Sequence, residues 1–467
     1  MPERNIYLLS PKKYSPETIA VAFAKTSRSP LSFQEIADEL NDEASAEFHE
    51  KWVVGYGHAS VAEHAVLHIA IENVSRMAIE SIESNRLASY TEKSTRYQKW
   101  DLDAFVIPPE LDGHPLRELY EQTVRMLFQT YADSLAPARE LVMQRNPRRD
   151  GESDALWDRR IRSKYVDSCR FLLPAASIAN VGLTANARVL ENAIRKLLSH
   201  PLAEVRQIGE TVKAVAQGET PTLVKYAEPV PYWQQVEKDF ATNSPIPSGV
   251  GKQKLTTLID HDPAAENKVL AAALYRFGEM PYQEALSFIQ DIPAEKRAEL
   301  AKKLLGGMDK YDIPPRELEY SHYTFDLVMD QGAYFEFKRH RMMSQTPQML
   351  TADLGYAVPK LISEAGFEAR YTTAMDAAAD AYQKLAAFNP QVASYLVPNG
   401  FNRRVLATFN LREAYHFVQL RAARNAHFSI RRVVREVYAE IEKQHPLLAK
   451  FMRLPEDVTW QDHFTSF

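Results

Sequence analysis
The chain has 467 residues, more than one hydrophobic core ordinarily holds, so we expect two or three domains. Its 45% hydrophobic and 25% charged residues are typical of a soluble globular protein. The formal net charge of -5 argues against general nucleic-acid binding, and no apolar run approaches the roughly 18 residues that a membrane span needs. The single cysteine, Cys169, excludes an intramolecular disulfide and indicates a reducing compartment, so we expect a cytoplasmic location.

The first predicted helix begins after Ser15-Pro16-Glu17, and its pattern returns late in the chain. Residues 17–40 (ETIAVAFAKTSRSPLSFQEIADEL) align with residues 267–289 (NKVLAAALYRFGEMPYQEALSFI) in nearly constant register. The matched positions are Ile19/Leu270, Ala20/Ala271, Ala22/Ala273, Pro30/Pro281 and Glu35/Glu284. One such match arises by chance, so the interpretation as a repeat needs further matched segments.

Two further segments recur in the same order. Residues 170–193 match residues 394–417, and both contain Thr-X-Asn-X-Arg at the start of a predicted helix. The segment around Ser84-Asn85-Arg86 matches the segment around Arg339-His340-Arg341. Three matched landmarks in one order indicate an internal duplication.

The expected organisation is two copies of one domain. We assign residues 1–237 to an N-terminal copy, 238–268 to a linker rich in proline, serine and charge, and 269–467 to a C-terminal copy. The periodicity is mostly helical, with short strand candidates at 65–74 and 321–329.

A short polar cluster in the N-terminal copy, Glu92-Lys93-Ser94-Thr95-Arg96, combines hydroxyls, cations and backbone N–H groups. A phosphate monoester requires such converging donors and a planar guanidinium. The alternative interpretation is an ordinary solvated surface. Upstream, residues 57–64 (GHASVAEH) hold two histidines, a hydroxyl and a carboxylate. The HExxH pattern is absent, so we expect no metal site there, and the alternative is a polar helix cap with Glu63 and His64 paired locally.

The most basic predicted helical region covers residues 410–435 and carries six arginines (Arg412, Arg421, Arg424, Arg431, Arg432 and Arg435). Aromatic residues lie between them, which predicts that this region is half buried. Buried arginines need anionic partners, so an internal anion site is favoured over a solvated cationic face or an RNA-binding helix. No Cys–His or Ser–His–Asp constellation is present, which indicates that a cofactor carries any difficult chemistry.

These motifs together resemble the flavin-dependent thymidylate synthases. The resemblance rests on GHxSVxEH at 57–64, on Arg339-His340-Arg341 as the RHR of RHRx7S, and on Thr-X-Asn-X-Arg followed by Leu-Arg. It spans nearly the whole chain, twice. It implies an α+β fold in which each tandem copy is helix-rich with a small antiparallel sheet. It also implies methylation of dUMP with FAD as cofactor and NADPH and methylenetetrahydrofolate as co-substrates.

Each copy keeps only part of the family pattern. In the N-terminal copy the RHR positions read Ser84, Asn85 and Arg86, whereas GHxSVxEH and the phosphate loop at 92–96 are kept. Its late arginine is replaced by Lys196 or by Leu197, depending on a one-residue gap.

The C-terminal copy shows the reverse pattern. RHR and the late arginine, Arg421, are present, but the loop serine and arginine have become Met349 and Thr351. Ser394 stands at the position of Arg170, and GHxSVxEH keeps only Glu319.

The resemblance assigns roles residue by residue. The catalytic residue is Arg421. The implied cofactor contacts are Ser60, Glu63, Glu92, Arg339, His340, Arg341, Asn410, Arg412 and His416. The implied nucleotide contacts are Glu92, Lys93, Ser94, Thr95, Arg96, Arg170, Glu336, Arg339 and Arg421.

Family sites draw their phosphate loop and their RHR from different subunits of a homotetramer. Joining the N-terminal phosphate loop to the C-terminal RHR gives one nearly complete site. The opposite pairing joins two degenerate motifs and gives a site that could bind little. We therefore expect a homodimer of two-copy chains that mimics the tetramer, with two functional and two degenerate sites.

One position departs from the family pattern. The glutamine three residues before RHR is Glu336 here and Ser81 in the other copy. A carboxylate only accepts hydrogen bonds, whereas an amide also donates, so a cytosine amino group would suit Glu336 better than uracil. The alternatives are therefore an enzyme acting on another pyrimidine nucleotide and a catalytically silent protein that binds flavin or nucleotide.

Overall fold

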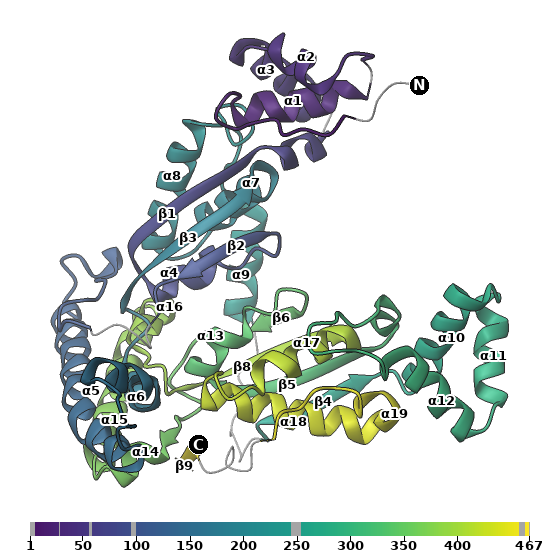
Figure 1. Ribbon diagram of the computed structural model, residues 1–467. Coiled ribbons are helices and arrows are strands. Elements are labelled where there is room, and N and C mark those ends of the chain that lie inside the picture. Colours follow the sequence, from purple (N-terminus) through teal and green to yellow (C-terminus); the bar gives the residue numbers. More distant parts are fainter. Residues whose placement is uncertain are drawn as a thin grey trace. The chain divides into compact units, whose positions relative to one another are not determined.

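The computed structural model describes residues 5–27, 29–55, 58–94, 100–243, 254–456 and 463–466, which form two compact units (Figure 1). Unit 1 comprises Met1–Ser94, Asp103–Glu121 and Ala175–Pro247. Unit 2 comprises Thr95–Leu102, Gln122–Pro174 and Ser248–Phe467, so it contains the C-terminal copy and two helical stretches of the N-terminal copy.

Unit 1 begins with short helices whose starts are capped as the sequence predicts. Ser15 accepts the N–H of Thr18 ahead of Pro16, and Ser32 with Glu35 forms a capping box. The elements of unit 1 are α1 (Pro16–Thr26), α2 (Phe33–Asp38), α3 (Asp42–Phe48), a π-helical turn (His49–Gly55), a 3-10 helix (Ala59–His64), β1 (Val66–Ser75), α4 (Arg76–Ile82), β2 (Ala88–Glu92), β3 (Ile178–Asn186), α7 (Ala187–Leu198), α8 (Ala203–Gln217) and α9 (Pro231–Asn243).

The sheet of unit 1 is antiparallel, in the order β1-β3-β2. Side chains of β1 alternate between buried and exposed, so one face of the sheet is available for helices. Helix α7 packs against α8, where Gly209 allows close approach. A Cβ at Gly209 would lie 2.8 Å from the Cβ of Leu197.

Unit 2 contains a four-stranded antiparallel sheet in the order β4-β5-β8-β6. The strands are β4 (Thr256–His261), β5 (His322–Asp330), β6 (Ser344–Pro347) and β8 (Asn402–Asn410), with a small pair β7 (Val358–Pro359) and β9 (Phe464–Ser466). The helices are α5 from Gln122 onward (Arg117–Arg145), α6 (Asp154–Cys169), α10 (Ala265–Gly278), α11 (Tyr282–Asp291), α12 (Ala294–Leu305), α13 (Gln331–Phe337), α14 (Lys360–Glu364), α15 (Glu368–Ala386), α16 (Pro390–Ala393), α17 (Leu411–Arg421), α18 (Phe428–Gln444) and α19 (Pro446–Ala449).

The two sheets share one topology. Strands β1, β3 and β2 with helices α4 and α7 correspond to β5, β8 and β6 with α13 and α17. Equivalent cross-strand hydrogen bonds survive, since the side chains of His68 and Thr184 are 2.9 Å apart and those of Thr324 and Thr408 are also 2.9 Å apart. The predicted fold class, two tandem helix-rich copies each with a small antiparallel sheet, is confirmed.

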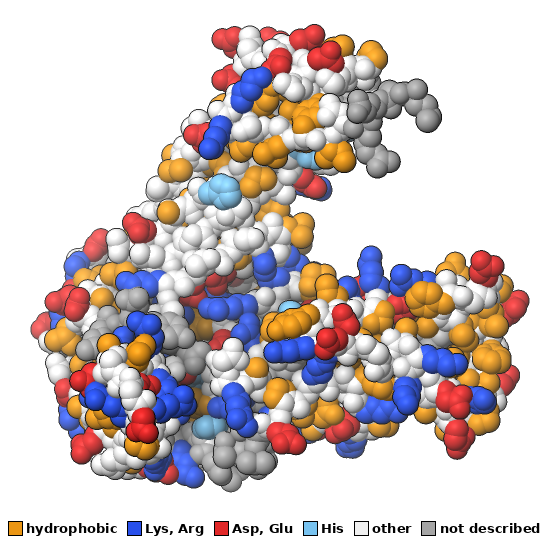
Figure 2. Space-filling view, viewed as in Figure 1, with side chains coloured by type: hydrophobic (Ala, Val, Ile, Leu, Met, Phe, Trp, Pro, Cys, Tyr) orange, Lys and Arg blue, Asp and Glu red, His pale blue; other side chains and the backbone are white. Residues whose placement is uncertain are grey.

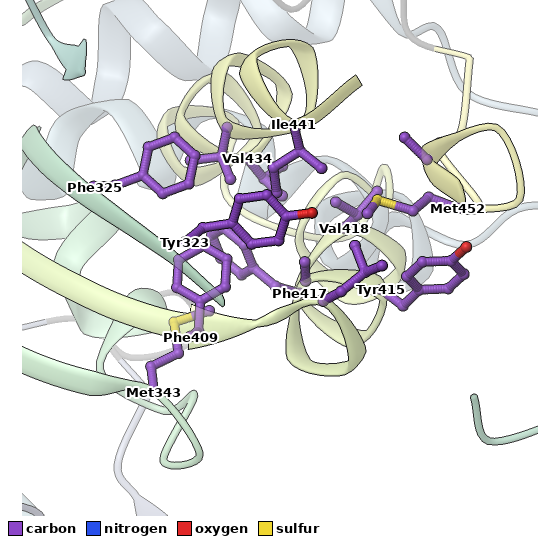
Figure 3. Packing of buried hydrophobic residues seen from close by; sticks show 14 of the residues in the cluster. Tyr323, Phe325, Met343, Phe409, Tyr415, Phe417, Val418, Val434, Ile441 and Met452 are labelled. Carbon is purple, nitrogen blue, oxygen red and sulfur yellow. The ribbon is translucent and has the colours of Figure 1, made fainter. Parts of the chain in front are cut away.

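A large hydrophobic core lies between the sheet of unit 2 and helices α17 and α18 (Figure 3). The rings of Phe325 and Phe409 stack with centroids 5.6 Å apart. The hydroxyl of Tyr323 lies 2.8 Å from Nδ1 of His445, and the hydroxyl of Tyr415 donates to the carbonyl of Leu448 at 2.5 Å, so both polar tips have partners. Figure 2 shows hydrophobic side chains between charged ones over α10–α12. No helix among the described residues is long and apolar enough to cross a membrane.

The segment expected to be a linker, residues 238–268, contains regular structure. Helix α9 continues to Asn243, β4 pairs with β5, and α10 begins at Ala265, whereas residues 244–253 lie outside the described residues. Thr256 is buried and Leu258 packs against the core, which explains why this short, weakly periodic segment forms an edge strand.

His200 makes the stability of unit 1 depend on pH. Burial lowers the pKa of His200 to about 4, and its Nδ1 accepts the N–H of Leu202 at 3.1 Å. An unfolded histidine has a pKa of about 6.5, so acid protonates the unfolded chain first. This contribution is present above about pH 6.5 and is lost as the pH falls toward 4.

We therefore expect His200→Asn to reduce the loss of unfolding free energy between pH 7 and pH 5 by about 2 kcal/mol, because asparagine can accept the same N–H without titrating. Urea denaturation at the two pH values measures this. His114→Asn is the matched control, since Nδ1 of His114 accepts the N–H of Leu116 at 3.2 Å. An unchanged pH dependence in His200→Asn would contradict the assignment.

Candidate functional site
The RHR segment directly follows α13, and its histidine is buried at 3% exposure. Nδ1 of His340 lies 2.8 Å from Oε1 of Glu413, and Nε of Arg421 donates to Nε2 of His340 at 3.0 Å. Glu413, Phe417 and Arg421 follow one another at four-residue intervals on α17, so a single helix face presents all three to His340. The Phe417 ring meets the imidazole edge-on, with centroids 4.8 Å apart.

This geometry determines the tautomer of His340. An arginine Nε always carries hydrogen, so Nε2 of His340 must accept, and Nδ1–H therefore donates to Glu413. Burial lowers the pKa of His340, although the carboxylate of Glu413 partly opposes that shift. His340 is thus a neutral link between Glu413 and Arg421, and both of its ring nitrogens are used inside unit 2.

The other side of Arg421 meets Glu336. NH1 of Arg421 lies 3.1 Å from Oε2 of Glu336, and the N–H of His427 donates to Oε1 at 3.2 Å. Burial lowers the pKa of Arg421, and Glu336 opposes this. The internal anion site expected along this basic region therefore contains a carboxylate of the chain itself.

A cleft of 330 Å³ lies at the start of α17. It brings together three of the expected cofactor contacts, Asn410, Arg412 and His416. Arg412 is anchored at the cleft wall, since its NH1 is 2.7 Å from Oε1 of Glu319 and its Nε donates to the carbonyl of Pro314 at 2.8 Å. The remaining lining residues mix charge with apolar surface: Lys310, Tyr311, Asp312, Ile313, Met342, Glu413, Gln419 and Leu420.

In the N-terminal copy, Glu92 is buried rather than facing outward. Its Oε1 lies 3.1 Å from NH1 of Arg76 on α4, and both side chains are almost fully buried. The equivalents of these two residues in the C-terminal copy are Gln331 and Pro347, so both members of the ion pair are replaced there. Lys93 continues the strand, with its N–H donating to the carbonyl of Asn180 at 2.8 Å. Thr95 and Arg96 lie outside the described residues.

In the N-terminal copy, Asn85 occupies the place of His340. Nζ of Lys196 donates to Oδ1 of Asn85 at 3.0 Å, while Leu197 lies in the core. Leu197 stands nine residues after Arg188, as Arg421 stands nine residues after Arg412, and Lys196 is the preceding residue on the same helix. Burial lowers the pKa of Lys196, and Arg86 lowers it further.

The GHxSVxEH segment borders an aromatic cavity of 540 Å³ in unit 1. Ser60, His58 and His64 line it, and the His64 ring stacks on Phe23 with centroids 4.9 Å apart. The cavity at the corresponding helix of the C-terminal copy has 580 Å³ and is lined mainly by apolar residues such as Leu270, Leu274, Leu300, Leu304 and Ile313. The decay of the motif in that copy therefore changed the chemistry of the cavity.

One ion pair is common to both copies. Arg188 on α7 pairs with Glu63, and Arg412 on α17 pairs with Glu319. Asn186 and Asn410 cap these helices in the same way, each accepting an N–H three residues on at 2.9 Å. The local pairing of Glu63 with His64 considered from sequence is replaced by the pair with Arg188.

Arg170 lies in unit 2, against the C-terminal copy. Its side chain is buried beside Asp167, with Nε 3.7 Å from Oδ1, and its carbonyl accepts Nδ2 of Asn399 at 2.9 Å. The carbonyl of Asp167 is 3.1 Å from Nε2 of His427, whose own N–H reaches Glu336. Equivalent residues of the two copies, Pro174 and Pro398, form an antiparallel bridge here.

Four contributors were not among the predicted site residues: Arg76, Arg188, Glu413 and His427. Arg188 was detectable, because it belongs to the repeated Thr-X-Asn-X-Arg. Glu413 left only a weak signal, an acidic residue in the first helical turn that is Val189 in the other copy. Among the described residues, no group of three or more His, Cys, Asp or Glu is placed to hold a metal ion.

Comparison with known proteins supports two copies of one domain. Residues 9–222 and 257–447 both match the family described as "Thymidylate synthase complementing protein". A UPF0159 protein of Chlamydia muridarum is 29% identical over 433 residues, covering 89% of this chain and 82% of that protein. A UPF0159 protein of Thermoplasma acidophilum is 28% identical over 454 residues, covering 89% and 90%.

Single-copy proteins match about half of the chain. A flavin-dependent thymidylate synthase of Clostridium tetani is 28% identical over 217 residues, covering 46% of this chain and 83% of that protein. A crystal structure of the UMP/dUMP methylase PolB from Streptomyces cacaoi, bound with 5-Br dUMP, is 19% identical with a TM-score of 0.35, covering 42% of this chain and 93% of that one. Since the family matches most of the length in two successive regions, the chain belongs to the thymidylate synthase complementing protein family, in a tandem form.

Proposed function
We propose that the chain is a flavin-dependent enzyme that methylates dUMP to dTMP, with FAD as cofactor and NADPH and methylenetetrahydrofolate as co-substrates. The observation that carries the proposal is the placement of Arg421 between His340 and Glu336, in the copy whose RHR is intact. Membership of the family and the names of single-copy relatives support the reaction class.

The cleft at Asn410, Arg412 and His416 fits part of a flavin dinucleotide chemically. Lys310 and Arg412 offer positive charge for phosphates, while Tyr311, Met342 and Leu420 offer apolar surface for a ring. Its 330 Å³ is at the small end of ligand pockets, which run from about 300 to 1,000 Å³, so further contacts are needed. Ser60, Glu63, Arg339 and Arg341 are the contacts that family resemblance adds. A bound FAD supplies the redox chemistry of the reaction.

The nucleotide would be held by its two ends. Lys93, Ser94, Thr95, Arg96 and Arg170 would bind the phosphate and so fix the orientation of the base. Arg421 would donate hydrogen bonds to the pyrimidine and stabilise negative charge that develops on the ring.

Complementary loss between the copies supports one composite site per chain. The N-terminal copy keeps the phosphate loop, and the C-terminal copy keeps RHR and Arg421. Neutral decay would not be expected to spare one whole set of partners. We propose a homodimer of two-copy chains in which such composite sites are the functional ones.

A second candidate is a catalytically silent protein that binds flavin and nucleotide. The observation in its favour is the pairing of Arg421 with Glu336, because a nearby carboxylate weakens the positive field that the reaction needs. Screening of the Arg421 charge in this way would leave ligand binding in place and remove turnover.

The first prediction distinguishes the two candidates. We expect purified protein to carry a yellow flavin whose spectrum changes on adding dUMP, and to oxidise NADPH. We also expect tritium release from C5-labelled dUMP that depends on methylenetetrahydrofolate. Flavin binding without NADPH oxidation or tritium release would contradict the enzyme and support the silent protein.

The second prediction concerns the choice of pyrimidine. Glu336→Gln should raise the affinity for dUMP relative to dCMP by about three- to tenfold, because an amide can donate to a uracil oxygen whereas a carboxylate is the better acceptor for a cytosine amino group. Calorimetric titration of both nucleotides measures the ratio. Glu319→Gln, which also removes a carboxylate beside an arginine, is the control and should leave the ratio unchanged. An equal ratio in Glu336→Gln and the parent would refute a role for Glu336 in base selection.

A further inference from the structure
We propose that Glu413 is a positioning residue that orients Arg421 through His340. Glu413 holds the imidazole in the tautomer whose Nε2 accepts from the guanidinium. Glu413 does not belong to the family motifs read from the sequence, and it lies 73 residues from His340 in the chain. The inference rests on the proposed function only for its nucleotide-binding readout.

The ring of His340 has little freedom apart from its tautomer. The main-chain N–H of His340 donates to the carbonyl of Phe337 at 3.0 Å, and its main-chain carbonyl accepts a hydrogen bond from Nε2 of Gln345 at 2.9 Å. Phe417 packs against the ring edge-on. With the ring held in this way, a hydrogen on Nε2 would face the hydrogen on Nε of Arg421, and the two donors would repel each other.

Capping of the helix does not explain the carboxylate of Glu413. The N–H of Glu413 donates to the cap residue Asn410, but the side chain turns to His340 instead. In the N-terminal copy, Val189 stands at the equivalent position, and its N–H makes the same bond to Asn186 at 2.9 Å. The cap therefore forms without a carboxylate, so the contact with His340 accounts for the carboxylate at position 413.

Glu413 and His340 are kept together in one copy and replaced together in the other. Glu413 and His340 are present together in the C-terminal copy, where an arginine must be held. In the N-terminal copy Asn85 meets Lys196 directly, with Val189 in place of the acid. An ammonium group has no fixed plane to orient, whereas a planar guanidinium does.

The charges around His340 favour the neutral ring. Arg421 and His416 face it from α17, with the His416 ring 5.6 Å away, and both oppose a further positive charge. Arg339 lies next to His340 in the chain and also acts on Arg421, while Glu336 pairs with the far side of the guanidinium. Of the two acids, Glu336 and Glu413, it is Glu413 that contacts the imidazole, so its carboxylate decides which ring nitrogen carries the hydrogen.

The experiment measures the affinity for dUMP and the tautomer of the His340 ring, both on the full-length protein. Dissociation constants for dUMP are measured for the parent, Glu413→Gln, Glu413→Leu, Arg421→Ala and the double variant Glu413→Leu/Arg421→Ala. We expect Glu413→Leu to weaken binding about tenfold and Glu413→Gln by less than about threefold, because glutamine still accepts from Nδ1–H. Glu440→Gln on α18, an acid paired with Lys254, is the matched control and should bind like the parent.

The double variant separates positioning from a merely structural effect. If Glu413 acts through Arg421, the double variant should bind no more weakly than Arg421→Ala alone. Additive losses would overturn the proposal, and so would parent-like binding by Glu413→Leu.

A second measurement does not depend on nucleotide binding. In protein with ¹⁵N-labelled histidine, assigned with His340→Asn, long-range proton–nitrogen spectra should show hydrogen on Nδ1 of His340 and a bare Nε2 at neutral pH. Hydrogen on Nε2 would overturn the proposal even if a leucine variant failed to fold. Absence of dUMP binding by the parent, with the Nδ1–H tautomer observed, would refute the proposed function but leave the link from Glu413 to His340 in place.

Discussion
A guanidinium that is largely withdrawn from water needs acceptors, and Arg421, whose side chain is 18% exposed, meets His340 through Nε and Glu336 through NH1. The rest of the candidate site follows from that constraint. Helix α17 is placed so that Glu413 and Arg421 reach the same imidazole, and the packing of Phe417 and Phe409 below them keeps the helix on the sheet.

The duplication explains why the two halves of the chain carry different polar networks on one scaffold. Both copies keep an ion pair between a 3-10 helix (Ala59–His64 or Arg316–Tyr320) and the helix that follows β3 or β8: Glu63–Arg188 and Glu319–Arg412. Elsewhere partners change together: Arg76 and Glu92 are absent as a pair from the C-terminal copy, and Arg421 and His340 from the N-terminal one. Paired change is expected when removing one member would leave a buried charge alone.

The duplication and the fold class were predictable, because matched landmarks and periodic apolar positions are local signals. The roles of the candidate site residues stay predictions. The contact partners of those residues were not predictable, since His340–Glu413 and Arg421–Glu336 join positions far apart in sequence. Strand β4 was included in the expected linker because edge strands need little periodicity. The contact of Lys196 with Asn85 joins positions 111 residues apart, so the sequence did not reveal it. The expected contact of Glu336 with the base stays a prediction, whereas its ion pair with Arg421 joins positions 85 residues apart and was not revealed by the sequence.

The central claim is that each chain contributes one functional nucleotide site, built from the phosphate loop of an N-terminal copy and Arg421 of a C-terminal copy. Calorimetric titration with dUMP tests it through stoichiometry, in the parent and in Arg96→Ala and Arg421→Ala. The account predicts one nucleotide per chain, with binding severely weakened by either substitution. Two nucleotides per chain, or binding that survives one of the substitutions unchanged, would contradict it.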